Sequence, residues 1–184
     1  MLEQLVGESQ ALDRAIAGEE LSLKDGMELM NFENLHMLGA VADITRKKLV
    51  GDAVTFAASY YMNYTNVCAA SCQMCAFYRK GHEDDAYTLT PEQIEKRVSM
   101  AKEMGATEVH IVGGFHPKLQ LDYYEEMMRI IKKNHPHLNI KAFTAAEIFY
   151  LSKLTKNSVK EILSRLKEAG LDSMPGGGAE LFHP

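Results

Sequence analysis

Three cysteines stand close together in one segment, Cys68-Ala-Ala-Ser-Cys72-Gln-Met-Cys75, and the chain has no others. An odd number packed this tightly is not the pattern of a disulfide framework, so it indicates a reducing compartment and thiolates that act as ligands. Thiolates bind iron–sulfur clusters, and a short loop with gaps of three and two residues can place three of them around one cluster. In a four-iron cluster, three protein ligands leave one iron open to bind another molecule.

Two simpler interpretations of the cysteines stay open at this point. The three thiols could be buried as small apolar side chains, or they could bind structural zinc with His82 as a fourth ligand. Structural zinc usually takes its four ligands from two separated pairs, and this segment offers a single run of three. The spacing, together with the strand expected just before it, favours the cluster.

The cysteines lie within a series of alternating strand and helix patterns. We expect four strands, at 54–61, 108–112, 138–143 and 171–174. Helices are expected after the capping boxes that begin at Thr90 and Ser158, and a third over 122–133, which Pro136 prevents from continuing. Strands that alternate with helices in this way are typical of a parallel sheet or barrel.

Each segment that contains candidate functional residues follows the end of an expected strand. These segments are the cysteine loop, Gly113-Gly114, Thr144 and Gly176–Gly178. In α/β barrels the carboxyl ends of the strands carry the active site, but a closed barrel needs about 250 residues. We therefore expect an α/β fold, a partial (β/α) TIM-type barrel corresponding to the N-terminal half only, over 51–184. A helical N-terminal extension is expected over 1–50, and the chain is expected to be a fragment or half of a split protein.

The composition excludes several classes of protein. Hydrophobic residues make up 46% and charged residues 24%, which is typical of a globular chain rather than a disordered one. A net charge of -5 argues against a nucleic-acid partner. No run approaches the roughly 18 apolar residues of a membrane span, and the acidic N-terminus is unlike a signal peptide. We expect a soluble, cytoplasmic protein.

The CxxxCxxC pattern after the first strand of a βα barrel resembles the radical S-adenosylmethionine (SAM) superfamily. The resemblance implies a 4Fe-4S cluster on Cys68, Cys72 and Cys75, with SAM as co-substrate on the open iron. It also implies an external one-electron donor of the flavodoxin or ferredoxin type, and a 5′-deoxyadenosyl radical. The family usually has an aromatic residue where Met74 stands, and Phe77 could still supply an aromatic wall near the adenine.

Longer strings narrow the resemblance within the superfamily. Residues 63–68, 75–79 and 175–180 are similar to the futalosine enzymes of menaquinone biosynthesis, and the first two also to deazaflavin (FO) synthase subunits. Residues 108–117 and 141–147 look like aminofutalosine synthase, whereas its siblings tend to have Gln in place of Val112 and a His-Ser/Ala-Phe-Ser-Pro string at 141–145.

That resemblance implies a transferase reaction. The 5′-deoxyadenosyl radical would add to 3-[(1-carboxyvinyl)oxy]benzoate and give 6-amino-6-deoxyfutalosine. The alternatives are the dehypoxanthinyl futalosine cyclase or an FO synthase subunit. A different class of alternative is an inactive cluster-binding fragment, or a subunit that needs a complementary C-terminal half.

The resemblance also implies roles for residues that bind SAM. Gly113 and Gly114 would let the backbone approach the methionine part of SAM, although such a pair is also typical of a tight turn with positive φ. Glu180 would accept hydrogen bonds from the ribose hydroxyls, although it also fits a flexible loop near a chain end.

Three further residues are candidates for substrate contact: His116, Lys141 and Thr144. Lys141 could neutralise a substrate carboxylate or be a surface charge, and Thr144 could instead cap a helix. His110 lies on an expected strand, where a histidine is more often a buried, hydrogen-bonded residue than a substrate contact. No residue is assigned as a catalytic acid or base.

Overall fold

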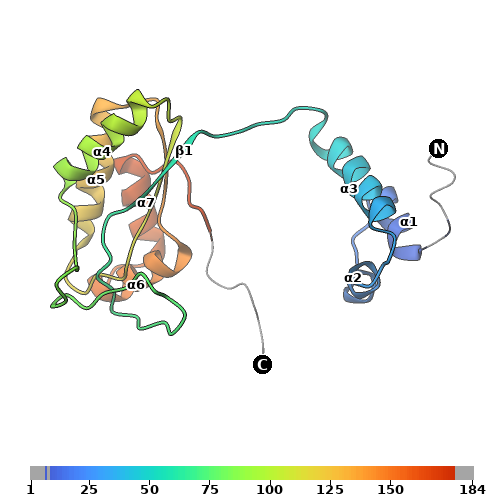
Figure 1. Cartoon of the computed structure of the whole chain (residues 1–184), viewed down its shortest axis with the longest axis horizontal. Coiled ribbons are helices and arrows are strands. Elements are labelled where there is room, and N and C mark those ends of the chain that lie inside the picture. The colour runs from blue at the N-terminus through green and yellow to red at the C-terminus, as the bar shows by residue number, and fades with distance from the viewer. Residues whose placement is uncertain (1–6, 8, 177–184) are drawn as a thin grey trace. The chain divides into compact units, whose positions relative to one another are not determined.

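The computed structural model describes residue 7 and residues 9–176, and the chain divides into two compact units, Met1–Phe56 and Ala57–Pro184 (Figure 1). The N-terminal unit has three helices, α1 (Gln10–Ala17), α2 (Leu23–Met30) and α3 (Leu35–Val50). Leu12, Met37 and Val41 form its small core. The helical extension was expected, and the domain boundary predicted at residue 50 stays a prediction.

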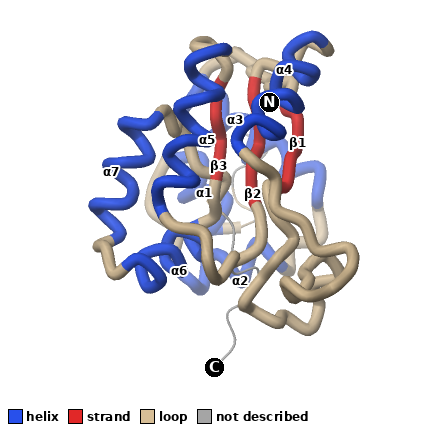
Figure 2. The backbone as a smooth tube through the Cα atoms, turned by 90° about the vertical axis from the view of Figure 1, so that its left-hand side faces the viewer, coloured by secondary structure: helices blue, strands red, loops and turns tan. Residues whose placement is uncertain are grey.

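The larger unit contains a parallel sheet in the order β1 (Ser59–Asn63), β2 (Glu108–Val112) and β3 (Asn139–Ala142). Four helices accompany it: α4 (Pro91–Glu103), α5 (Leu121–Asn134), α6 (Ala145–Thr155) and α7 (Val159–Ala169). Figure 1 shows α4, α5 and α7 on one side of the strands, and Figure 2 shows the strands side by side. The predicted α/β class and partial (β/α) barrel are therefore confirmed.

Alternation along the strands separates two faces of the sheet. Val109, Ile111 and Ile140 are fully buried in the core shared with the helices. The opposite face carries Tyr61, His110 and Lys141, which lie in one row of the strand register. The Tyr61 and His110 rings lie 5.1 Å apart, and Tyr61 is 59% exposed. The inward face of this partial barrel is therefore polar and open.

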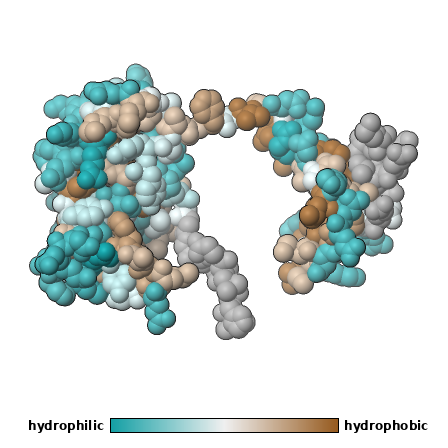
Figure 3. Space-filling model, viewed as in Figure 1, coloured by the Kyte–Doolittle hydropathy of each residue, from teal (hydrophilic) through white to brown (hydrophobic). Residues whose placement is uncertain are grey.

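Two expected elements differ from the structure. The first strand was expected at 54–61, but it spans Ser59–Asn63, and Val54 and Phe56 are 89% and 91% exposed with no strand partner. Apolar side chains gather on the surface beyond the end of α3 (Figure 3). A high β-propensity does not form a strand where no ladder is available.

One helix, α6, was expected only through the alternative in which Thr144 caps a helix. It begins directly after Thr144, which forms with Glu147 in the first turn a capping box of the kind predicted at Thr90. The fourth expected strand is reduced to a parallel bridge between Ser173 and Lys141, beside β3. Among the described residues, no helix is long and apolar enough to span a membrane.

Candidate functional site

The cysteine loop follows β1, and hydrogen bonds connect the residues at its base. The buried hydroxyl of Thr65 donates to the carbonyl of Tyr87 at 2.7 Å. Beyond it, the N–H of Cys68 donates to the carbonyl of Arg79 at 3.0 Å, and the N–H of Arg79 donates to the carbonyl of Asn66 at 2.8 Å. These hydrogen bonds connect the two ends of the cysteine loop, so the loop starts and ends at fixed positions.

The three cysteines differ in exposure. Cys72 is exposed, whereas Cys68 and Cys75 are half-buried, and the N–H of Cys75 donates to the carbonyl of Cys72 at 3.1 Å. The interpretation of three buried apolar thiols is therefore wrong. Across residues 9–176, no three His, Cys, Asp or Glu side chains are grouped closely enough to hold a metal ion, so the structure assembles neither a cluster site nor a zinc site with His82.

The chemistry of the donor set nevertheless fits an iron–sulfur cluster. The loop offers three thiols, and the backbone N–H of Phe115 already donates to the sulfur of Cys68 at 3.3 Å. A cluster thiolate is commonly stabilised by such N–H donors. The ammonium of Lys80 also donates to the hydroxyl of Ser71 at 2.6 Å, which braces the spacer between the first two cysteines.

Gly113 and Gly114 pack directly on the base of the loop. A Cβ atom on Gly113 would lie 2.6 Å from the ring of Tyr64, and one on Gly114 would lie 2.3 Å from the carbonyl oxygen of Val67. Neither glycine has a positive φ, so the tight-turn explanation for the pair is wrong. Glycine is required here because another part of the main chain or a ring approaches too closely for a side chain.

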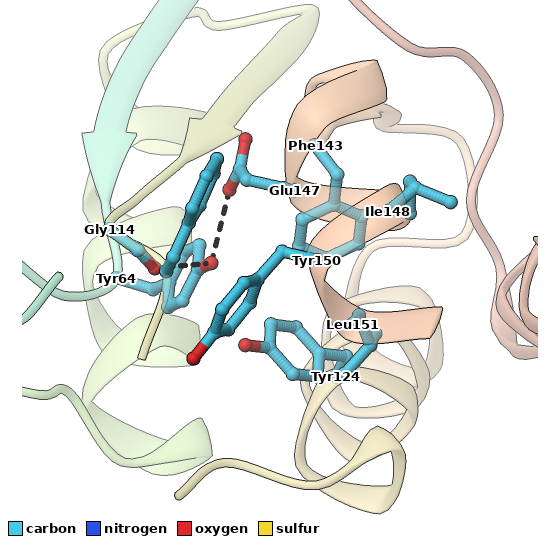
Figure 4. Close-up of a pocket in the computed structure, with 9 residues that line it drawn as sticks. Tyr64, Gly114, Tyr124, Phe143, Glu147, Ile148, Tyr150 and Leu151 are labelled. Atoms are coloured by element: carbon cyan, nitrogen blue, oxygen red, sulfur yellow. Dashed lines mark hydrogen bonds between the residues drawn. The ribbon is translucent and has the colours of Figure 1, made fainter. Parts of the chain in front are cut away.

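Glu147 is a buried carboxylate beside this contact, and the sequence pattern did not indicate a role for it. Its Oε1 accepts from the N–H of Gly113 and the hydroxyl of Tyr64, each at 3.0 Å, as Figure 4 shows for the tyrosine. Its Oε2 accepts from the N–H and the hydroxyl of Thr144 at 2.7 and 2.9 Å. Burial raises the pKa of Glu147 despite these hydrogen bonds, which act to lower it.

Aromatic rings surround this carboxylate. Tyr64 is 1% exposed, and burial holds its pKa well above the usual value, with further contributions from Tyr124 and Glu147. Phe115 and Tyr150 stack with ring centroids 5.0 Å apart. The cavity between these rings and Glu147 has about 10 Å³ of free space, which holds no more than one water. The rings therefore pack around the carboxylate rather than forming a ligand pocket.

The predicted substrate contacts lie in different places. The Nδ1 of His116 accepts from the N–H groups of Lys118 and Leu119, and the residue borders a groove of about 240 Å³ beside Val67. Burial, and then the charge of Lys118, lower the pKa of His116. Lys141 pairs with Glu108 at 2.9 Å on the inward face of the sheet.

The other predicted site residues are placed as follows. Thr144 caps α6, which is the simpler of its two interpretations. Phe77 is 41% exposed on the cysteine loop. Glu180, Gly177 and Gly178 lie outside the described residues, and their predicted roles stay predictions. The structure thus brings the glycine pair to the cysteine loop and leaves Lys141 in an ion pair away from it.

A family model described as the Radical SAM superfamily matches residues 62–179. The chain belongs to the radical SAM superfamily. Among curated proteins it is 43% identical over 169 residues to "Aminodeoxyfutalosine synthase" of Streptomyces coelicolor, covering 90% of this chain and 43% of that protein. It is 39% identical over 172 residues to "Cyclic dehypoxanthine futalosine synthase" of Halalkalibacterium halodurans, covering 93% and 46%. The chain therefore spans a little under half the length of these radical SAM relatives.

A solved structure shares the fold. The FeFe-hydrogenase maturase HydG from Carboxydothermus hydrogenoformans superposes with a TM-score of 0.61 at 21% identity, over 94% of this chain and 47% of that chain. At that identity the likeness concerns the fold alone. The family membership shows that the CxxxCxxC loop belongs to a radical SAM domain, in which a 4Fe-4S cluster and SAM are general features.

Proposed function

We propose that this chain is the cluster-bearing part of a radical SAM transferase of the aminofutalosine synthase type. Cys68, Cys72 and Cys75 would bind a 4Fe-4S cluster, and SAM would be the co-substrate. The observation that carries the proposal is the joint surface at the ends of β1 and β2, where Gly114 packs on Val67 and Phe115 donates to the sulfur of Cys68. The ligand loop and the glycine pair are thus one unit.

The residues of this surface have separate tasks in the proposal. The Gly113-Gly114 backbone, free of side chains, would lie along the methionine part of SAM. Phe77 would cover the adenine, and Glu180 would accept from the ribose. When bound and reduced by an external one-electron donor, the cluster supplies the electron that cleaves SAM.

The substrate proposed is 3-[(1-carboxyvinyl)oxy]benzoate, and the product is 6-amino-6-deoxyfutalosine. The identity of 43% to the aminodeoxyfutalosine synthase supports this choice, as do the strings at 108–117 and 141–147. His116, beside the groove next to Val67, is the best placed of the proposed substrate contacts. Lys141 keeps a contact to Glu108 at 2.9 Å, so it would bind a substrate carboxylate with the remaining donors of its ammonium group.

A sibling activity is the second candidate, because the cyclic dehypoxanthine futalosine synthase is nearly as similar, at 39% identity. A third candidate is a cluster-carrying chain that acts only with a complementary half. This candidate is favoured by the inward face of the sheet, where Tyr61 is 59% exposed.

An anaerobic product assay tests these candidates. The cluster is reconstituted, and reductant, SAM and 3-[(1-carboxyvinyl)oxy]benzoate are added while nucleosides are followed by mass spectrometry, with Cys72→Ala as control. The expected result is that the unaltered chain forms aminofutalosine and the Cys72→Ala variant does not. Accumulation of 5′-deoxyadenosine alone would contradict the proposed substrate, and absence of SAM cleavage at full iron load would favour the chain that needs a partner.

A further inference from the structure

Glu147 joins three parts of the larger unit that are distant in sequence. Its carboxylate accepts hydrogen bonds from the N–H of Gly113 just after β2, the hydroxyl of Tyr64 just after β1, and the N–H of Thr144 at the start of α6. The residue is 7% exposed, so these bonds form away from water. Hydrogen bonds to a buried charged group are among the stronger ones in proteins.

The bond to Gly113 fixes the position of the residues that follow it. The N–H of Gly114 donates to the carbonyl of Thr65 at 3.0 Å, and the N–H of Ala69 donates to the carbonyl of Phe115 at 2.8 Å. Phe115, between these bonds, directs its own N–H at the sulfur of Cys68. Loop 113–115 therefore contacts the first cysteine through Phe115, and Glu147 fixes the orientation of this loop through its hydrogen bond to Gly113.

We propose that Glu147 is a positioning residue, which holds loop 113–115 so that the Phe115 N–H keeps its hydrogen bond to the Cys68 sulfur and thereby raises the reduction potential of the cluster. The direction follows from charge. A donor directed at a ligand sulfur stabilises the more negative, reduced cluster, and hydrogen bonds to sulfur are a recognised determinant of cluster potential. The inference rests on the proposed function only in requiring a cluster on Cys68.

A carboxylate is needed for this task because all four groups facing it are donors. Glutamine has one acceptor oxygen and one NH₂ group. If its oxygen faces Gly113, its NH₂ opposes the N–H of Thr144, and in the other orientation it opposes the N–H of Gly113. Glu147→Gln therefore keeps the size of the side chain and loses at least one of the two backbone anchors.

The matched control is Glu125→Gln on α5. Glu125 is 4% exposed, so its side chain is covered as completely, but it lies under the partly exposed Arg165 and Arg129, with which it pairs, and not against the loop. It reports the general cost of removing a buried carboxylate.

The first measurement uses the reduced, metal-free chain and needs no activity. Amide hydrogen exchange is followed at Gly113, Gly114 and Phe115. We expect at least about tenfold faster exchange in Glu147→Gln, since the N–H of Gly113 then faces either a neutral oxygen or an opposing NH₂ group instead of a charged acceptor. No change is expected at these amides in Glu125→Gln. Equal exchange in the two variants would overturn the positioning role.

The second measurement is the midpoint potential of the reconstituted cluster, followed by electron paramagnetic resonance. A lower potential is expected in Glu147→Gln and an unchanged one in Glu125→Gln. If Glu147→Gln does not fold, Phe115→Pro removes the donating N–H directly, and Phe115→Leu keeps it while removing the ring that stacks on Tyr150. Equal potentials in the proline and leucine variants would overturn the inference.

The outcome separates this inference from the proposed function. A lowered potential with no aminofutalosine formed would contradict the substrate and leave the role of Glu147 intact. If the chain binds iron and makes the product, but the cluster potential is unchanged in Glu147→Gln, the proposed function is supported and the role of Glu147 is contradicted. A chain that binds no cluster would overturn both.

Discussion

Gly114 lies so close to the main chain of Val67 that a Cβ atom on the glycine would stand 2.3 Å from the Val67 carbonyl oxygen. Neither main-chain segment can yield easily, because Val67 precedes Cys68 and the N–H of Gly114 is bonded to Thr65. We expect Gly114→Ala to destabilise the larger unit by about 1–3 kcal/mol, as overpacking does, and to lower the iron bound on reconstitution.

Gly81→Ala is the matched control for this prediction. A Cβ atom there would meet only a methyl group of Val67 at 3.7 Å, which is ordinary contact, and Gly81 has no positive φ. Denaturant unfolding and iron analysis of both variants decide the point. A Gly114→Ala chain as stable and as iron-loaded as Gly81→Ala would show that the close approach has no consequence.

The ligand role of the cysteines predicts the metal content of single variants. Replacing Cys68, Cys72 or Cys75 by serine should remove the iron–sulfur absorbance and most of the iron and sulfide. Met74→Leu, at a 96% exposed position of the same loop, should leave them unchanged. Zinc at one atom per chain, with no iron after anaerobic purification, would contradict the cluster assignment.

Glu125 predicts a pH dependence of stability. The hydrogen bond from Arg165, and then that from Arg129, hold the pKa of this carboxyl below its ordinary value of 4.5. A lowered folded-state pKa means that the stabilisation is fully present above pH 4.5 and is lost as the pH falls through the folded pKa.

Glu125→Gln should therefore lower the free energy of unfolding by about 1–2 kcal/mol at neutral pH, since both arginines are partly exposed. The difference from the unaltered chain should shrink as the pH falls below 4.5 and through the lowered folded-state pKa of Glu125. Thermal unfolding across this range measures it, and a constant difference would refute the ion-pair explanation.

The Glu108–Lys141 pair predicts a coupling between two substitutions. Removing the amine alone, in Lys141→Met, leaves the 4% exposed Glu108 without its cation, and the hydrogen bond from Lys141 is one of the contacts that lower the pKa of Glu108 against its burial. We expect a loss of about 1–2 kcal/mol that Glu108→Gln partly restores in the double variant. A rise in KM for the aromatic substrate with unchanged stability would instead favour the direct substrate contact.

The sequence predicted elements where a local signal was strong. The capping signals at Thr90 and Ser158 located the starts of two helices, because such bonds are made within one turn. Thr90 forms the full capping box, whereas at Ser158 only the bond from the N–H of Glu161 to the serine side chain forms. The capping box at Thr144 carries the same signal, but a helix there was only the alternative to a substrate contact. The strand expected from Val54 failed because its pairing depends on a distant partner.

The site was predictable only in part, for a similar reason. The spacing of the cysteines is local, so the sequence alone was sufficient to propose them as cluster ligands. The contacts of Glu147 with Tyr64 and Gly113 span 83 and 34 residues of sequence, and no local pattern records them. The packing of the glycine pair was likewise not predicted, because a close approach of Val67 cannot be read from the residues beside Gly114.

The parallel sheet also has a consequence for how the chain folds. Ser59 pairs with Glu108 across 49 residues, whereas Glu108 pairs with Asn139 across 31. Because distant pairings close larger loops, we expect β2 and β3 to associate with α5 first and β1 to join them late and slowly. Within the described residues the outer edge of β1 has no strand partner. During refolding that edge is a ready template for a second chain, so the yield of monomer should fall as protein concentration rises.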